Sequence, residues 1–305
     1  MIFSRRRLAL FALVAVTLFL GAVGWFSPQR PWQETTGWDL IVHVNPSSQL
    51  EPDIQWLGHS GFLIQWEGVH ILLDPNLSES CPPVKRLFPA PRVQWPQQLD
   101  AAIISHGHYD HYDLDTLEAV PNLKSIVAPE GLGKWLPDSL RTGTLFHPMI
   151  EDRTLQVGAL KIVAVKAIHS GARSHPFGST SPALGYIISN GQTSIYFAGD
   201  TAYGEHFKQI ARDHHPQIAI LPIGSYEPYI VLKHHHLNPR DAVKAARDLQ
   251  VDLVIPCHFG TYRLAFDRPQ TALPLFARLA DEAGLNWKMP ELPGMGGPQI
   301  VWRKP

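Results

Sequence analysis

The sequence predicts an α/β fold in which two β-sheets pack together and helices lie outside them. Short apolar runs bounded by turn residues dominate the chain after residue 50, and in its later part such runs alternate with helical patterns. Of the 305 residues, 45% are hydrophobic and 17% are charged. A chain of this length and composition buries a sizeable core and is not disordered.

An antiparallel meander is expected at the start of the fold. Its three apolar runs, Ile54–Leu57, Phe62–Trp66 and His70–Leu73, are separated only by Gly-His-Ser-Gly and Glu-Gly, which are turn sequences. The stretch from Asp74 to Leu99 is rich in proline and lacks a regular period, so we expect a surface loop. Ala101–Ile104 then predicts a short buried strand.

Strands and helices are expected to alternate in the rest of the chain. Asn190-Gly191 is a strong two-residue turn signal and predicts a hairpin between Leu184–Ile188 and Ser194–Phe197. The other expected strands are Ser125–Val127, Leu160–Val165, Ile218–Leu221 and Leu253–Ile255. The expected helices are Leu114–Val120, Gly131–Leu136, Glu205–Arg212, Pro239–Leu249 and Thr271–Ala283.

Residues 1–30 are predicted to be a membrane anchor that precedes a domain of residues 31–305. The uncharged stretch Leu8–Phe26 has 19 residues, and as a helix rising about 1.5 Å per residue it nearly crosses a hydrocarbon core of roughly 30 Å. A secretory signal peptide, the alternative, usually has a shorter apolar region. Arg5–Arg7 favour a cytoplasmic N-terminus. We therefore expect a single-pass protein of the inner (cytoplasmic) membrane with its domain on the extracytoplasmic side.

Composition restricts the function classes. The net charge of −1 gives no global field that would attract nucleic acid, so no nucleic-acid partner is expected. The two cysteines, Cys81 and Cys257, cannot form a disulfide framework or a four-thiolate zinc site. The chain has 16 histidines, and histidine is the commonest metal ligand in proteins.

A dense cluster of potential metal ligands follows the strand predicted at Ala101–Ile104. His106, His108, Asp110 and His111 form an H-x-H-x-D-H pattern. On an extended turn His106 and His108 point the same way, and the last two residues can face a second ion. Imidazole and carboxylate ligands suit zinc, with iron or manganese as alternatives. The competing interpretation is a solvated polar loop, and four ligands directly after an apolar strand argue against it.

Three further metal-capable residues also follow predicted strands. His169 ends the run that begins at Leu160, Asp200 follows the hairpin strand in Phe-Ala-Gly-Asp-Thr, and His258 follows Leu253–Ile255 in Pro-Cys-His-Phe-Gly. Taken singly, each fits an ordinary polar residue. Their common position at strand ends predicts that they complete one metal centre.

The order of these motifs resembles the metallo-β-lactamase-fold hydrolases. Within them the chain is most similar to the N-acylphosphatidylethanolamine-hydrolysing phospholipase D group. The similarity extends from about Ile54 to beyond Phe266, and Tyr-Glu-Pro and His-x-x-Pro narrow it to that group. The matching segments are Trp56–Ser60, Leu73–Pro75, Ile104–His111, Phe197–Tyr203, Pro222–Pro228, His236–Pro239 and His258–Thr261.

The resemblance implies an αββα sandwich with a dinuclear zinc site at one edge between the sheets. One zinc ion would be held by His106, His108 and His169, and the other by Asp110, His111 and His258, with Asp200 bridging them. A hydroxide between the ions would be the nucleophile, which Asp110 orients, and His236 would donate a proton or hydrogen bond to the scissile group. For His234–His236 together, a solvated segment before a helix is the competing interpretation.

Residues around this set are assigned other roles. The resemblance makes His59 a structural residue rather than a ligand. Asp74 is expected to support a ligand histidine through its free ring nitrogen. His206 has no motif context and is expected at the surface.

The function expected from the resemblance is a membrane-tethered zinc phosphodiesterase of phospholipase D type. Its substrates would be N-acylphosphatidylethanolamine-like glycerophospholipids. The alternative is a dizinc hydrolase of a small lactone, amide or phosphoester in the cell envelope, because Ser170–Ser174 lacks the tryptophans expected of the lipid-cleaving enzymes. A scaffold without catalysis would lack ligands, and all seven are present. A homodimer is implied by analogy alone.

Contact with an anionic lipid surface is a further expectation. The segment expected to make this contact is the proline-rich loop Pro82–Arg92, which could equally be a surface loop that only covers the domain. The residues expected to touch the surface are Lys85, Arg86, Leu87, Phe88 and Arg92.

Overall fold

A computed structural model gives the fold of residues 41–42, 51–173, 181–289 and 300–301. The predicted N-terminal anchor lies outside these residues. Within the described part of the chain, no helix has both the length and the apolar character needed to cross a bilayer.

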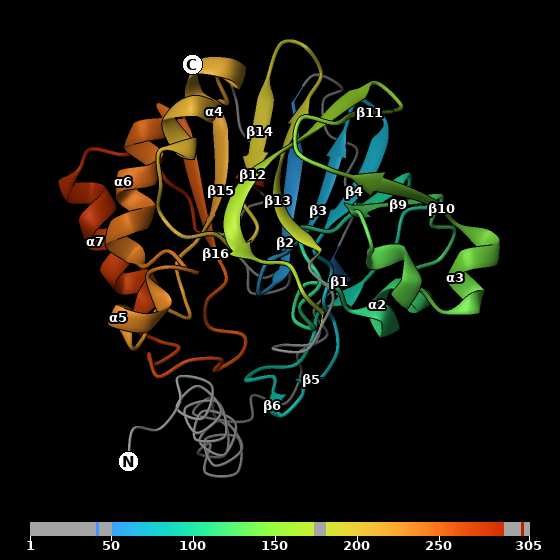
Figure 1. Cartoon of the computed structure of the whole chain (residues 1–305), viewed down its shortest axis with the longest axis horizontal. Helices are drawn as coiled ribbons and strands as arrows, with labels where there is room; N and C mark the ends of the chain where they lie inside the picture. The colour runs from blue at the N-terminus through green and yellow to red at the C-terminus, as the bar shows by residue number, and fades with distance from the viewer. Residues whose placement is uncertain (1–40, 43–50, 174–180, 290–299, 302–305) are drawn as a thin grey trace, which may run out of the picture.

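Two β-sheets pack face to face at the centre of the molecule (Figure 1). In spatial order the first sheet comprises β10 (Leu145–Met149), β9 (Ser125–Pro129), β8 (Ala101–Ile103), β4 (Val69–Leu73), β3 (Gly61–Trp66), β2 (Asp53–Gly58) and β17 (Ile300–Val301). The second comprises β11 (Thr154–Val157), β12 (Leu160–Ser170), β13 (Pro182–Ser189), β14 (Ser194–Phe197), β15 (Ile218–Pro222) and β16 (Leu253–Cys257). Two short strand pairs lie outside them, β1 (Ile41–Val42) with β7 (Arg92–Val93) and β5 (Ser80–Cys81) with β6 (Val84–Lys85).

Helices cover the outer face of each sheet (Figure 1). The first sheet is covered by α2 (Leu114–Ala119), the 3₁₀ turn η1 (Leu132–Trp135) and α3 (Asp138–Gly143). The second is covered by α4 (His206–His214), α6 (Pro239–Leu249) and α7 (Ala272–Glu282), while α5 (Tyr229–Leu232) lies at one end. The predicted pair of sheets with helices outside, an αββα sandwich, is confirmed.

Three apolar clusters correspond to the three interfaces between these layers. Phe62 and Ile64 of β3 belong to the cluster between the sheets, together with Phe197 of β14. Leu63, on the opposite face of β3, packs in the cluster under α2. Successive side chains of a strand point to opposite faces, and both faces of β3 are buried, so its central residues form a continuous apolar run from Phe62 to Ile64.

The largest differences from the predicted elements lie between residues 136 and 160. The sequence did not predict α3, β10 or β11. β10 is an edge strand that contains Pro148 and is mostly half-exposed, so it lacks the apolar run of a central strand. The predicted hairpin is present, but Asn190–Thr193 connect its strands instead of two residues. The Asn190 side chain caps this turn by accepting from the backbone N–H groups of Gln192 and Thr193.

The candidate ligands converge because the strands before them end at one edge. β8 runs parallel to β4, β14–β16 are parallel to one another, and β12 has the same direction as β14. The carboxyl ends of such strands meet at the same side of a sheet. Gly199 follows β14 with φ +58° and sits where a Cβ atom would lie 2.4 Å from the Cβ of Ser105. This contact brings the two sheet edges together next to Asp200.

A substitution at Gly199 should therefore cost more than one at Gly191, which precedes the same strand. Gly191 also has positive φ, but open space surrounds it. Gly191→Ala should lower the free energy of unfolding by about 1–2 kcal/mol through backbone strain alone. Gly199→Ala adds a clash and should lower it by roughly 2–5 kcal/mol. Urea denaturation of the metal-free variants measures both values, and equal losses would contradict the close approach.

Candidate metal centre

The first group of potential ligands consists of three histidine rings. Nε2 of His106 lies 3.0 Å from Nδ1 of His108, and Nε2 of His169 lies 3.2 Å from the same atom. Nδ1 of His106 donates to the Ser105 hydroxyl, and Nδ1 of His169 donates to the His235 carbonyl at 2.8 Å. A neutral ring that donates from Nδ1 carries its lone pair on Nε2. The Nε2 lone pairs of His106 and His169 therefore both face His108.

The second group brings Asp110, His111 and His258 together with His59. Oδ2 of Asp110 lies 3.4 Å from Nε2 of both His111 and His258, and 2.9 Å from Nε2 of His59. Nε2 of His111 and Nε2 of His258 are buried and have no hydrogen-bond partner among the described residues. The structure thus places His59 inside this cluster, as a further residue that could ligate a metal ion. The sequence pattern had indicated a structural role for this residue.

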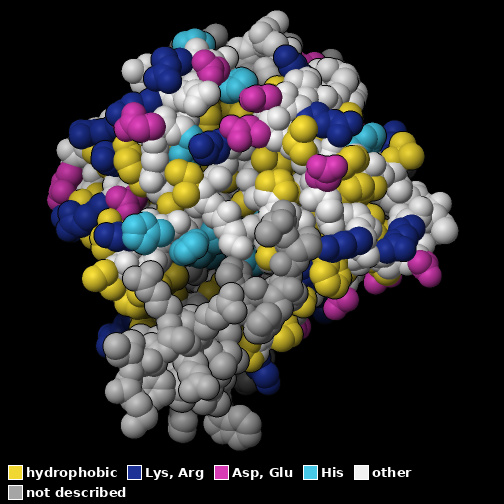
Figure 2. Space-filling view, viewed as in Figure 1, with side chains coloured by type: hydrophobic (Ala, Val, Ile, Leu, Met, Phe, Trp, Pro, Cys, Tyr) yellow, Lys and Arg dark blue, Asp and Glu magenta, His cyan; other side chains and the backbone are white. Residues whose placement is uncertain are grey.

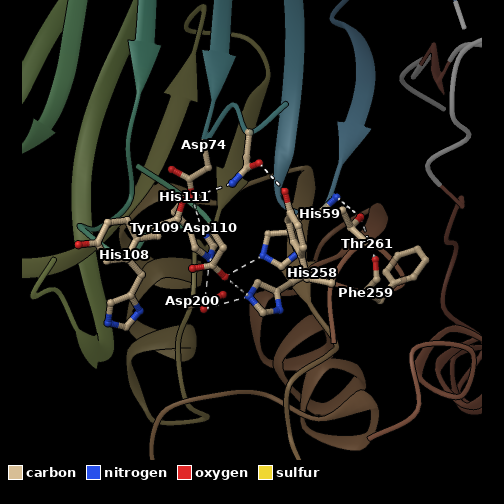
Figure 3. Close-up of polar contacts among 12 residues, drawn as sticks. His59, Asp74, His108, Tyr109, Asp110, His111, Asp200, His258, Phe259 and Thr261 are labelled. Carbon is tan, nitrogen blue, oxygen red and sulfur yellow. Dashed lines mark hydrogen bonds and ion pairs between the residues drawn. The ribbon is translucent and has the colours of Figure 1, made fainter. Parts of the chain in front are cut away.

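Asp200 lies between the two groups. Its Oδ2 is 3.2 Å from Nε2 of His258, 3.3 Å from Nε2 of His111 and 3.9 Å from Nε2 of His169. Figure 3 shows His108 on one side of Asp200, with His59 and His258 on the other. A single carboxylate oxygen is therefore within reach of both groups, as the bridging role expected of Asp200 requires.

The donor spacings fit two metal ions. Two nitrogen ligands of a tetrahedral zinc ion, each about 2.0–2.1 Å from the metal, lie roughly 3.3 Å apart. The separations within both groups range from 3.0 to 3.4 Å and match this value, except for the shorter His59 contact. Asp200 lies at 3.2 and 3.3 Å from the second group and at 3.9 Å from His169 of the first. Buried polar atoms normally have hydrogen-bond partners, so the partnerless nitrogens are explained if a cation lies among them. The chemistry and the spacing of these residues therefore fit a dinuclear centre.

The Asp74 carboxylate orients a histidine of each group. Its Oδ2 accepts from Nδ1 of His111 at 2.6 Å and from the Ser105 hydroxyl at 2.5 Å, and Oδ1 accepts from the Ser105 backbone N–H. The Ser105 oxygen in turn accepts from Nδ1 of His106. Asp74 thus holds one ring directly and another through Ser105, which confirms the supporting contact expected of it.

The loop that carries His258 is fixed by its backbone. His258 has φ +57°, and its N–H donates to the His59 carbonyl at 2.9 Å. The His59 N–H donates to the Thr261 hydroxyl at 2.7 Å (Figure 3). Gly224 lies so close that a Cβ atom there would meet the His258 carbonyl oxygen at 2.0 Å. Only glycine fits at position 224, and this packing places the ring of His258 opposite Asp200.

The cluster carries buried carboxylates whose charges require compensation. Burial alone would raise the pKa of Asp200, but His258 and His111 hold it well below its ordinary value. Burial alone would lower the pKa of His258, but Asp200 and Asp110 raise it to about 9. The same carboxylates, with Asp74, hold the pKa of His111 well above its ordinary value. In the metal-free protein, protons on these two rings supply the positive charge that metal ions would supply.

His236 joins this site from the segment before α6. Its Nδ1 lies 3.5 Å from Oδ2 of Asp200, and its side chain is 14% exposed, whereas those of His111 and His258 are fully buried. Burial lowers its pKa to about 4, although Asp200 acts in the opposite direction. The ring is therefore neutral near pH 7 and lies on the solvent side of the cluster. His234 and His235 are exposed, as a solvated segment predicts.

All seven predicted ligands and His236 are thus brought together, but three other expectations change. Arg86, expected at a lipid surface, is only 6% exposed and donates to the carbonyls of Asn76 and Leu57. His206, expected at the surface, is buried with its ring facing Thr201. His59 follows a strand end as the ligands do, so the rule used for them would have found it.

Arg173 is a residue that no sequence pattern indicated. Its guanidinium donates to the Tyr112 carbonyl at 2.6 Å and to the Gly107 carbonyl at 3.4 Å, and it lies 4.4 Å from the ring centre of Tyr109. These contacts span the loop that contains His108, Asp110 and His111. Arg173 therefore ties the two ends of the metal-binding loop together. A lone arginine in a loop of small residues gives no signal that could have predicted this.

Comparison with known proteins agrees with the geometry. Residues 70–259 match the Beta-lactamase superfamily domain. An uncharacterized protein of Mycobacterium tuberculosis is 34% identical over 70% of this chain. The N-acyl-phosphatidylethanolamine-hydrolyzing phospholipase D 1 of Caenorhabditis elegans is 32% identical over 68% of it. The chain spans 59% and 63% of the lengths of these two relatives. A UPF0173 metal-dependent hydrolase of Koribacter versatilis is 31% identical over 75% of this chain and 92% of its own length.

Solved structures share the fold at low sequence identity. A metallo hydrolase of Ignicoccus hospitalis has a TM-score of 0.61 and 19% identity, covering 83% of this chain and 99% of its own. CmlA, a diiron β-hydroxylase of Streptomyces venezuelae, has a TM-score of 0.60 and 18% identity, covering 81% of this chain and 54% of its own.

Metal binding should release protons. At pH 7.5 both rings are protonated in the metal-free protein, because neighbouring carboxylates raise the pKa of His258 to about 9 and hold the pKa of His111 well above its ordinary value. A ring nitrogen must lose its proton to bind a metal ion. Calorimetric titration with zinc at pH 7.5, in buffers of different ionisation enthalpy, should report release of about two protons per chain. The number should fall as the pH rises through 9, and His258→Gln should lower it by about one. A heat independent of the buffer would contradict the binding of metal by rings that are protonated beforehand.

Removing the charge of Asp74 should weaken metal binding. In Asp74→Asn the amide keeps one acceptor oxygen, so it cannot accept from the Ser105 backbone N–H and also from the Ser105 hydroxyl and His111, and the ring orientation that these bonds fix is weakened. We expect the affinity for zinc, measured by competition with a chromophoric chelator, to fall about 10–100-fold. Asp100→Asn is the matched control, because that carboxylate accepts from His70 and Lys124 away from the cluster. An unchanged affinity in Asp74→Asn would contradict the supporting role.

Proposed function

The chain belongs to the beta-lactamase superfamily, and on this premise we propose that it is a dinuclear metal hydrolase that cleaves a phosphodiester bond of N-acylphosphatidylethanolamine-like phospholipids. The observation that carries the proposal is the position of Asp200 Oδ2, within 3.9 Å of ring nitrogens of both donor groups. One carboxylate can thus join two ions, and paired ions are the usual means of hydrolysing phosphoesters.

The seven predicted residues would hold the metal. His106, His108 and His169 would bind one ion, Asp110, His111 and His258 the other, and Asp200 both. Two divalent ions bound there would lower the pKa of water and offset negative charge on the phosphoryl oxygens. Zinc is proposed from the imidazole and carboxylate donors. Iron remains the alternative, because a diiron enzyme shares the fold.

Asp110 and His236 would act on the reacting groups. Oδ2 of Asp110 accepts from His59 at 2.9 Å, which fixes the carboxylate as an acceptor that can orient the attacking water. His236 is neutral near pH 7 and lies on the solvent side of Asp200. Its ring is therefore placed to hydrogen-bond the substrate phosphoryl group or the leaving oxygen.

The proposed substrate rests on the relatives as well as the site. A relative that is 32% identical is named for the hydrolysis of N-acyl-phosphatidylethanolamine. Water would attack phosphorus, and the bond from phosphorus to the N-acylethanolamine oxygen would break. The products would be phosphatidic acid and N-acylethanolamine. Such a substrate resides in a bilayer, which agrees with the proposed anchor at residues 1–30 and an extracytoplasmic domain. We propose a homodimer by analogy with the same group.

Product analysis tests this proposal. The zinc-loaded full chain, incubated with vesicles that contain N-acylphosphatidylethanolamine, should yield phosphatidic acid and N-acylethanolamine by mass spectrometry. Asp200→Ala should reduce turnover by at least about 10³-fold because it removes the group that joins both ions. Intact lipid, together with turnover of a soluble phosphodiester or lactone, would exclude the lipid and support the small-substrate hydrolase. Full activity of Asp200→Ala with its metal retained would exclude the bridged centre.

A second variant separates the role of His236 from metal binding. His236→Ala should keep the metal content and lower kcat about 10²–10³-fold, as loss of one hydrogen-bond donor to the reacting oxygens does. Loss of metal in this variant would instead make His236 a ligand.

A further inference from the structure

An apolar patch lies on the short helix α5, between the Tyr-Glu-Pro segment and the three consecutive histidines. None of its four residues is buried, and Ile230 and Val231 are 76% and 57% exposed. Tyr229 is exposed beside them, as is Phe266, whose N–H donates to the Glu227 carbonyl just before the helix. Three consecutive exposed apolar side chains, Tyr229, Ile230 and Val231, therefore form a patch on α5, and apolar patches rimmed by polar residues mark interaction or membrane sites.

This patch is connected directly to the metal centre. The Leu232 carbonyl, at the end of α5, accepts from the backbone N–H groups of both His235 and His236 at 2.8 Å. The His235 carbonyl holds His169, and the ring of His236 faces Asp200. Figure 1 shows α5 at the end of the molecule where β5 and β6 lie, and in Figure 2 apolar and histidine side chains adjoin in the region over α5.

We propose that α5 is the surface by which the enzyme docks on the lipid bilayer that contains its substrate. Tyr229, Ile230 and Val231 would enter the interface between headgroups and acyl chains, with Phe266 beside them. A phosphodiester at headgroup depth would then lie next to His236. This inference rests on the proposed lipid substrate. The residues of α5 would bring the metal centre to that lipid.

Charges around the patch complement a phospholipid surface. Lys233 directly follows α5, and Lys233 and Arg268 are exposed, so both can meet lipid phosphates. Two acidic residues also adjoin α5: Glu227 is exposed and accepts from the Tyr229 backbone N–H, and Asp241 accepts a hydrogen bond from the Tyr229 hydroxyl. The uncharged stretch Leu8–Phe26 is followed by only 14 residues before the first described residue, Ile41. A chain anchored by that stretch therefore has a bilayer within reach of the domain.

A fluorescent label at position 230 tests the docking without any activity measurement. The native Cys81 and Cys257 are buried, so Ile230→Cys offers the accessible thiol for labelling. In the full chain, reconstituted in vesicles of phosphatidylethanolamine and phosphatidylglycerol with brominated acyl chains, bromine should quench this label. Leu145→Cys is the matched control, because Leu145 is 68% exposed on the edge strand β10. Equal, weak quenching of both labels would overturn the proposal. A patch that is covered by a protein partner instead of lipid would give this result.

Turnover gives a second, independent measurement. Ile230→Ser/Val231→Ser should lower turnover of vesicle-borne lipid at least about tenfold, since it removes two side chains that would leave water on docking. Turnover of soluble bis(p-nitrophenyl) phosphate should stay within about twofold, because exposed positions tolerate such changes. The pair Leu145→Ser/Ile150→Ser should affect neither substrate. A parallel loss on both substrates would overturn docking through α5. Quenching at position 230 without lipid turnover would support docking and refute the proposed substrate.

Discussion

The hydrogen bonds of the buried Asp74 carboxylate are the contacts on which the metal centre depends. Asp74 follows β4 and accepts from Ser105 and His111 beyond the neighbouring β8, so one charge joins the ends of two parallel strands. Through the Ser105 hydroxyl it also fixes His106. A buried carboxylate is costly unless it is hydrogen-bonded and compensated. The hydrogen bonds that satisfy Asp74 also fix the protons of His111 and, through Ser105, of His106 on Nδ1. The Nε2 atoms of both rings are then left to face the proposed metal ions.

The rest of the centre follows the same logic of mutual compensation. Asp110 and Asp200 are buried, and in the metal-free protein protons on His111 and His258 offset their charge. Metal ions would replace those protons and would bind ring nitrogens that have no hydrogen-bond partner among the described residues. Sites of this kind sacrifice stability for function, and the three apolar clusters supply the rigid frame that holds the charged groups together.

The centre is also asymmetric with respect to solvent. The rings of His111 and His258 are fully enclosed, whereas His236 reaches Asp200 from a partly exposed segment whose backbone is tied to α5. The candidate ligands and the partly exposed side of the centre thus come from different parts of the fold. The ends of the strands hold the candidate ligands, and the loop between β15 and α6 carries both the partly exposed His236 ring and an apolar surface. This arrangement accounts for how a buried polar centre could reach a substrate held in a bilayer.

The sequence by itself determined the central strands of both sheets, the helix α6 and the candidate ligands at the strand ends, because periodicity and strand ends are local signals. The helix α6 begins at Pro239, as predicted, and Asn238 caps it. Only the tertiary structure decided that the His59 ring contacts Asp110, that Arg86 is buried and that Arg173 ties the two ends of the loop with His108, Asp110 and His111. Each of these side chains acts on residues of another strand end or loop. Such contacts depend on how the two sheets pack, and no local pattern in the chain records that packing.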